Sequence, residues 1–208
     1  MRFNGVRAMP TLHNMQMSGN CYKVRLVAHK LGIPLALKDY PVNGTLTRQP
    51  EFLSKNPNGR VPLLEFEDGR TLAESNAIIW HLSEGTDLQP ADNWGRAQAL
   101  QRMFFEQYSH EPYIAVLRFL RTYAPKDSAD PRLGRIAELE QRGHAALAVM
   151  ETHLGRHAWF AGGRFSVADI ALYAYTHVAG EGGFELARYP AVSAWLDRTA
   201  AQPRHIPL

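Results

Sequence analysis

Residues 61–75 read Val61-Pro62-Leu63-Leu64-Glu65-Phe66-Glu67-Asp68-Gly69-Arg70-Thr71-Leu72-Ala73-Glu74-Ser75, and this stretch decides the fold. The apolar run at 61–66 predicts a strand, and Asp68-Gly69 is a strong signal for a two-residue hairpin turn. A short strand at 70–72 should follow, and then a helix from about Ser75 to Ser83. The stretch therefore predicts two strands and a helix in direct succession.

The residues before this stretch predict two further strands and two helices. Strands are expected at 10–15 and 35–40, and a short helical piece at 50–54. Apolar residues from Val24 to Leu31 follow the i, i+3, i+4, i+7 spacing of an amphipathic helix, which Gly32 should end. The order through residue 84 is then β-α-β-α-β-β-α, an α/β domain at 9–84.

The pattern becomes helical beyond a polar linker at 85–93. Apolar residues at 97–108 and 136–154 recur every three or four positions, which predicts two long amphipathic helices. Pro112 should kink or break the first of them. Further helices are expected to start near Ser166, at the capping box in 165–170, and at Pro190. An all-helical domain at 94–208 is therefore predicted.

Composition excludes several classes of protein. The 208 residues include 23 Lys+Arg and 20 Asp+Glu, and a net charge of +3 is too dilute to indicate a nucleic-acid partner. A single Cys excludes a disulfide scaffold and fits a cytosolic location. No apolar run approaches the ~18 residues of a membrane span, and the start lacks the core of a signal peptide. Met9 is a candidate natural start, with residues 1–8 as an extension.

Val61-Pro62 is the first candidate binding element. A proline belongs at a strand start or edge because it removes a ladder donor, and an X-Pro bond can be cis. In a cis arrangement the backbone N–H and C=O of Val61 would face outward, where a ligand of peptide character could pair with them. An ordinary trans proline at a strand start explains the same residues.

Glu74-Ser75 stands where a helix is expected to begin. Ser75 suits the N-cap, and the unbonded N–H groups of a helix start attract carboxylates. Glu74 beside it could receive an ammonium, so the pair matches both charges of an amino acid. A plain cap with a solvated glutamate is the simpler interpretation.

Ser18-Gly19-Asn20-Cys21 precedes the first predicted helix. A helix N-terminus stabilises a thiolate, and a serine hydroxyl there can donate a hydrogen bond to it. Ser18 as a nucleophile is a competing idea, but no base and no G-x-S-x-G elbow accompany it. Each residue also has a purely structural explanation, Ser18 as a helix cap and Cys21 as a buried small apolar residue.

Two other groups of residues are candidates for a metal site or a binding site. His153 and His157 have a spacing that suits a metal, but Gly155 interrupts them and no third ligand is near, so no metal is expected. Tyr108 and Tyr113 lie on the helix that Pro112 should kink, and they are candidates to face the first domain.

Together these motifs resemble a cytosolic glutathione transferase with a serine-type active site, from Met9 to about Pro203. The resemblance rests on residues 18–25, 56–63, 74–78 and 165–170. It implies a thioredoxin-like glutathione-binding domain, a helical substrate-binding domain, a homodimer and a cytoplasmic location. The implied reaction is attack of glutathione thiolate on a small electrophile, as in detoxification, with glutathione as co-substrate and no metal, nucleic acid or membrane as partner.

The resemblance also implies roles for individual residues. Val61-Pro62 should be cis, with Val61 paired to the cysteinyl backbone of glutathione. Glu74 should hold the γ-glutamyl ammonium and Ser75 its carboxylate. Ser18 should stabilise the thiolate by lowering a pKa near 8.5 by roughly 1–2 units. Other expected contacts are Asn20 and Arg60 for glutathione, and Tyr108 and Tyr113 for the second substrate.

Two positions depart from the family pattern. Thr47 occupies a position where relatives often have His, and Gly59 occupies the basic position before the proline. Arg48 or Arg60 could substitute, so the residue that holds the glycyl carboxylate stays open. Two alternatives to conjugation also stay open: a glutathione-dependent reductase or isomerase, and a non-catalytic glutathione or ligand binder. Ser18 and Glu74 argue against the binder.

Overall fold

The computed structural model describes residues 9–124 and 130–208, so the possible extension at 1–8 lies outside the described residues. The chain divides into two compact units. One ends at Glu84 and also contains Pro203–Leu208, and the other runs from Gly85 to Gln202. The first unit contains the β-sheet, and the second unit consists of helices.

The first unit contains a four-stranded mixed sheet in the order β2-β1-β3-β4. β1 is parallel to β2 and antiparallel to β3, and β3 is antiparallel to β4. The first three strands are shorter than predicted, whereas β4 lies one residue later than predicted with the same length. β3, for example, begins after Pro62, because proline cannot donate to the ladder. Their bounds are β1 Thr11–Asn14, β2 Ala36–Asp39, β3 Leu63–Glu65 and β4 Thr71–Ala73.

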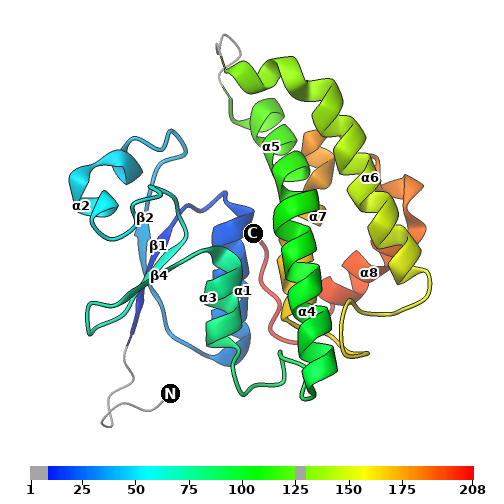
Figure 1. Cartoon of the computed structure of the whole chain (residues 1–208), viewed down its shortest axis with the longest axis horizontal. Coiled ribbons are helices and arrows are strands. Elements are labelled where there is room, and N and C mark those ends of the chain that lie inside the picture. The colour runs from blue at the N-terminus through cyan, green and yellow to red at the C-terminus, as the bar shows by residue number, and fades with distance from the viewer. Residues whose placement is uncertain (1–8, 125–129) are drawn as a thin grey trace. The chain divides into compact units, whose positions relative to one another are not determined.

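Helices α1 (Gly19–Leu31) and α3 (Ser75–Leu82) pack against each other on one side of this sheet, and the short α2 (Pro50–Leu53) lies on the other (Figure 1). Gly32 ends α1 in the left-handed conformation, with φ of 67°, as predicted. The predicted β-α-β-α-β-β-α order is confirmed. The unit is a thioredoxin-like domain.

The last six residues group with the first unit and not with the helical one, whereas the sequence prediction placed them in a helical domain at 94–208. The Tyr22 hydroxyl donates to the Ile206 carbonyl at 2.6 Å, and Lys30 Nζ donates to the Pro203 carbonyl at 2.7 Å. Both donors are on α1. The sequence carries no local signal for these contacts because the partners are far apart along the chain.

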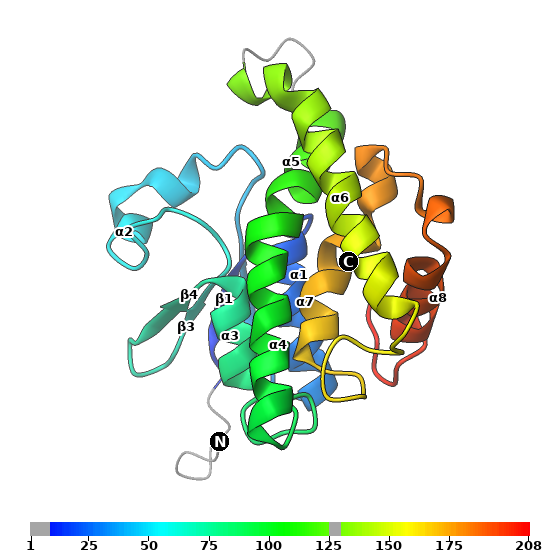
Figure 2. The ribbon, with the colours of Figure 1, turned by 45° about the vertical axis from the view of Figure 1, so that its right-hand side comes forward.

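The second unit is helical. Helix α4 packs on α7, α5 packs on α6, and α6 packs on α8 (Figure 2). All ten residues of α7 are buried, which explains its apolar sequence. The helices are α4 Asn93–Phe105, α5 Glu111–Thr122, α6 Ile136–Leu154, α7 Val167–Thr176 and α8 Pro190–Ala200. None of the helices in the described ranges combines the length and apolar character needed to cross a bilayer.

Two local predictions in this unit are confirmed. Pro112 lies in the first turn of α5, and a π-helical segment, Glu106–His110, separates α5 from α4. The capping box forms at the start of α7, where Ser166 N donates to Asp169 Oδ2 at 2.9 Å. The indole of Trp195 donates to the other oxygen of the same carboxylate at 3.0 Å. Asp169 therefore joins α7 to α8 as well as capping α7.

Candidate functional site

The strand register brings three predicted binding segments to one end of the sheet. His13 of β1 lies opposite Leu63 of β3, and Leu63 lies opposite Ala73 of β4. Because β3 runs antiparallel to both neighbours, its start lies beside the ends of β1 and β4. The segments that meet there are the loop from β1 to Ser18, the Val61-Pro62 bond and Glu74-Ser75.

Ser18 is the N-cap of α1. Its Oγ accepts a hydrogen bond from Cys21 N at 3.3 Å, and its side chain is partly exposed. A hydroxyl can accept and donate at once, so this cap is compatible with donation to a ligand. The partly exposed hydroxyl thus stands beside the N–H groups of the first turn, where an anion is stabilised.

Cys21 is fully buried, as predicted, and its Sγ accepts from Met15 N at 3.3 Å. Burial raises the pKa of the Cys21 thiol to about 11, with the hydrogen bond from Met15 acting in the opposite direction. The thiol is therefore protonated at neutral pH. The chain itself supplies no thiolate at the start of α1.

A polar network that sequence reasoning missed holds the loop between β1 and α1. Arg25 of α1 donates to Asn14 Oδ1 at 2.6 Å and to the Gln16 carbonyl at 2.9 Å. Asn14 in turn donates to Asp39 at 2.6 Å. Arg25 is largely buried, and burial lowers the pKa of its guanidinium. The sequence signal that could have indicated this network was Arg25, a charged residue among the apolar residues of the helix.

The Val61-Pro62 peptide bond is cis, which confirms that prediction. Val61 packs against a small apolar cluster formed by Tyr40, Phe52 and Leu63. The preceding carbonyl of Arg60 accepts from Asn56 Nδ2 at 2.8 Å, whereas the Arg60 side chain is exposed. The cluster and this bond hold the backbone on both sides of Val61.

Helix α3 begins at Ser75, as predicted, but its N-cap differs from the prediction. Glu74 and not Ser75 occupies the N-cap, with φ of 67°, a conformation that side-chain-bearing residues rarely adopt. Ser75 is the first helical residue and is buried, and its Oγ donates to Asn20 Oδ1 at 3.1 Å. Ser75 therefore does not cap α3, because its hydroxyl points toward α1. Glu74 is exposed beside it.

Lys23 joins these two helix starts and was missed by sequence reasoning. It is fully buried, and its Nζ donates to Asn20 Oδ1 at 2.8 Å. The same Nζ lies 3.3 Å from Ser75 Oγ and 3.3 Å from Asn76 Oδ1. The available sequence signal was a lysine one turn into a predicted amphipathic helix, between the large apolar residues Tyr22 and Val24.

Thr47 and Gly59, the two residues that depart from the family pattern, lie close together. Thr47 is buried, and its hydroxyl donates to the Gly44 carbonyl at 2.9 Å. Arg48 is exposed and donates to the Asn58 carbonyl at 3.1 Å. A Cβ on Gly59 would lie only 2.6 Å from Arg48 Nη1, so the missing side chain at residue 59 makes room for this guanidinium.

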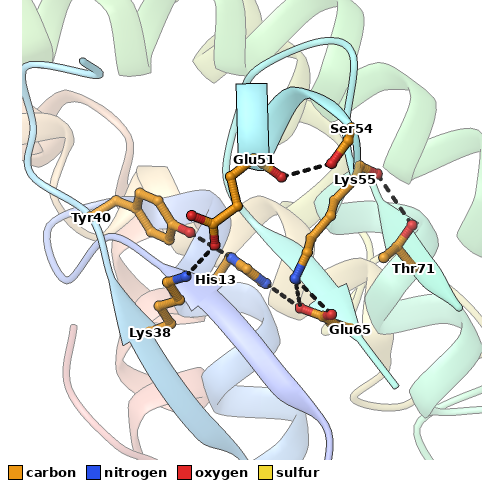
Figure 3. Close-up of polar contacts among 8 residues, drawn as sticks. All are labelled: His13, Lys38, Tyr40, Glu51, Ser54, Lys55, Glu65 and Thr71. Carbon is orange, nitrogen blue, oxygen red and sulfur yellow. Dashed lines mark hydrogen bonds and ion pairs between the residues drawn. The ribbon is translucent and has the colours of Figure 1, made fainter. Parts of the chain in front are cut away.

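On the α2 side of the sheet, His13 is buried in a chain of polar contacts (Figure 3). Its Nδ1 lies 2.8 Å from the Tyr40 hydroxyl, and its Nε2 lies 2.8 Å from Glu65 Oε2. Lys55 donates to both oxygens of Glu65 at 2.7 Å. Burial lowers the pKa of His13, opposed by Glu65. Because Tyr40 also packs against Val61, this network supports the cis-proline segment.

Two predicted residues lie in the helical unit. Tyr108 belongs to the π-helical segment and is 82% exposed. Tyr113 lies in the first turn of α5, with the Arg142 guanidinium 5.7 Å from its ring centre. Exposure leaves the Tyr108 ring available to a ligand, whereas the Tyr113 ring is partly covered.

His153 and His157 stack with ring centres 4.6 Å apart and do not converge on a common point. Both nitrogens of His153 are already bonded, to Arg102 at 3.0 Å and to the Trp159 carbonyl at 3.1 Å. A cavity of about 330 Å³ lies here, lined by Val149, Thr152, His153, Arg156 and His157. Across residues 9–124 and 130–208, no three His, Cys, Asp or Glu side chains are grouped so as to hold a metal ion.

Comparisons with known proteins identify the family to which both units are similar. The family described as glutathione S-transferase, N-terminal domain, matches residues 17–84, and its C-terminal counterpart matches residues 134–198. Glutathione S-transferase 3 of Zea mays is 30% identical over 202 residues, which cover 92% of this chain and 89% of that protein.

Solved structures show the same likeness. The glutathione S-transferase of Pseudomonas fluorescens Pf-5 is 47% identical, with a TM-score of 0.91 over 96% of this chain and 98% of that one. Yeast Ure2p in complex with S-hexylglutathione shares the fold, with a TM-score of 0.82 at 24% identity over 96% of this chain and 97% of that one.

Proposed function

The chain belongs to the glutathione S-transferase family, and on that premise we propose that it conjugates glutathione to a small electrophile. The observation that carries this proposal is the meeting of Ser18, Val61 and Ser75 at one end of the sheet. A hydroxyl at a helix N-terminus, the backbone at Val61 and a second helix start would fit a tripeptide with a thiol and a terminal carboxylate.

Ser18 is the residue proposed to stabilise the thiolate. Its hydroxyl would donate to the glutathione sulfur, and the first turn of α1 would add the positive end of a helix dipole. The thiolate then attacks the electrophilic carbon, so a C–S bond forms and the leaving group departs with its electron pair. Cys21 is not the nucleophile in this scheme, because its pKa of about 11 keeps it protonated.

Four further residues are proposed to contact glutathione. The Val61 backbone would pair with the cysteinyl residue, Glu74 would hold the γ-glutamyl ammonium, and Ser75 with Asn20 would hold the neighbouring carboxylate. Ure2p, which shares this fold, has been crystallised with glutathione itself, which supports a glutathione site here.

At the glycyl end we propose Arg48, with Arg60 as the alternative. Both guanidinium groups are exposed, and that of Arg48 is held at the loop before Val61 by its hydrogen bond to the Asn58 carbonyl. A guanidinium is a suitable partner for the terminal carboxylate of glutathione.

The second substrate and the assembly are further parts of the proposal. Tyr108 and Tyr113 are the candidates to contact the electrophile, in a cytoplasmic homodimer formed through α3 and α4. Trp94 and Phe104 of α4 are 73% and 69% exposed, which leaves apolar surface for a second copy. Light scattering should give twice the chain mass of 23.4 kDa, and a monomeric mass would refute the dimer.

The activity is tested by calorimetry with glutathione together with a panel of halogenated aromatic, disulfide and peroxide substrates. We expect binding and faster turnover of the halogenated aromatics. Faster turnover of disulfides or peroxides would favour the reductase, and binding without turnover would favour a non-catalytic binder. Absence of glutathione binding would refute the proposal as a whole.

A further inference from the structure

We propose that Lys23 is a positioning residue for the γ-glutamyl carboxylate of bound glutathione, acting through Ser75 and Asn20. This inference rests on the proposed function, since it concerns the same site. Lys23 is not expected to touch the ligand, because its side chain is fully buried. Its effect would be on the residues that do.

The ammonium of Lys23 contacts side chains in the first turns of both helices that border the site. It donates to Asn20 Oδ1 at 2.8 Å, and Ser75 Oγ and Asn76 Oδ1 each lie 3.3 Å away. Asn20 is in the first turn of α1, whereas Ser75 and Asn76 open α3. One buried charge therefore holds side chains from both helices in register.

This contact fixes how Ser75 can use its hydroxyl. An ammonium only donates, so it must engage a lone pair of Ser75 Oγ, which directs the hydroxyl hydrogen away from Lys23. In the structure that hydrogen is donated to Asn20 Oδ1 at 3.1 Å. A carboxylate arriving at the start of α3 can accept the same hydrogen, while the ammonium keeps the oxygen in place.

Packing alone does not require a charge at this position. An apolar side chain of the same length would fill the space without the cost of removing an ammonium from water. A buried positive charge beside the first two side chains of α3 favours an anion at that helix start. The geometry therefore points to the carboxylate of the ligand as the group that benefits from Lys23.

The test combines one substitution with two ligands. Lys23→Met keeps the length of the side chain and removes its charge. Glutathione is compared by calorimetry with 4-aminobutyryl-cysteinylglycine, which lacks only the γ-glutamyl carboxylate. We expect glutathione to bind Lys23→Met about tenfold more weakly than the wild type, as for the loss of a hydrogen bond to a charged group. The truncated ligand should bind both proteins equally.

Steady-state kinetics give a second readout. The KM for glutathione should rise about tenfold, in line with the binding loss, while kcat at saturating glutathione stays within about twofold. Lys38→Met, at an exposed lysine of β2 in the same unit, is the matched control and should change neither ligand's affinity. If Lys23→Met does not fold, Lys23→Gln replaces it with the same expectations.

Three results would overturn the inference. Equal weakening of both ligands would show that Lys23 supports the fold only. Unchanged glutathione binding would show that Ser75 and Asn20 need no help from Lys23, and a loss in kcat alone would place its effect elsewhere. Failure of the wild type to bind glutathione is a separate result, because it removes the proposed function itself.

Discussion

The hydroxyl of Ser75 donates to Asn20 Oδ1 at 3.1 Å, so the first residue of α3 is tied to the second residue of α1. This bond joins two helix N-termini, each of which favours an anion. The proposed site therefore has one end for the thiolate, near Ser18, and another for a carboxylate, near Ser75. Each end can be changed separately.

Removing the Ser18 hydroxyl should raise the pKa of bound glutathione. In Ser18→Ala we expect the pKa of the glutathione thiol to rise by roughly 1–2 units, with a 10- to 100-fold slower reaction near pH 6.5. The measurement is the pH dependence of kcat/KM. Ser18 also caps α1, so Ser18→Gly is the matched variant, because glycine costs the cap only a few tenths of a kcal/mol. An unchanged pH profile in both variants would remove Ser18 from the mechanism.

Two substitutions of Glu74 should separate the effect of its backbone strain on stability from the effect of its charge on glutathione binding. Glu74 has φ of 67°, which costs a residue with a side chain about 1 kcal/mol. Glu74→Gly should therefore unfold at higher urea concentration and bind glutathione more weakly, since the carboxylate for the ammonium is lost. Glu74→Gln keeps the strain and loses the charge, so it should weaken binding without the gain in stability. Equal urea midpoints for the two variants would contradict this account.

Arg48 is expected to contribute to the glycyl end of the site. In Arg48→Ala the affinity for glutathione should fall about two- to fivefold, as for an exposed ion pair. Calorimetry with γ-glutamylcysteine, which lacks the glycine, should show no difference between Arg48→Ala and the wild type. Arg60→Ala serves as the comparison. If only Arg60→Ala discriminates between the two ligands, Arg60 holds the carboxylate.

His13 should make stability depend on pH. Burial lowers its pKa below 6.5, so between the folded and unfolded pKa values the unfolded chain binds more protons at this residue. The stabilising effect of neutral His13 is present above pH 6.5 and is lost as pH falls through the folded pKa. Urea unfolding of His13→Gln, which keeps a donor and an acceptor, should lose less stability than the wild type between pH 7 and pH 5.

The comparison at pH 8 supplies the control for that experiment. There the imidazole is neutral in both the folded and the unfolded chain, so any difference between His13→Gln and the wild type reflects packing and hydrogen bonding with Tyr40 and Glu65. Subtracting this difference from the difference measured at lower pH leaves the loss of stability that is due to protonation of His13. Parallel losses of stability from pH 8 to pH 5 would show that folding does not change the pKa of His13.

Much of the fold could be predicted because its signals are local. The end of α1 at Gly32, the capping box at Ser166 and the break before Pro112 each depend on residues within a few positions of one another. The spacing of apolar residues then assigned each segment to helix or strand. Ser75 was placed wrongly as a cap, because its partner is on another helix and not in its own first turn.

Most of the polar contacts in and around the candidate site could not be predicted from those local signals. Lys23 contacts a serine 52 positions away, and Tyr22 contacts a carbonyl 184 positions away. Arg48 reaches the space left by Gly59 only because the intervening chain turns back on itself. Such contacts depend on how whole helices and strands pack, since each one joins groups from different elements. Local spacing thus determined the elements and their order, whereas packing decided which polar side chains meet at the end of the sheet.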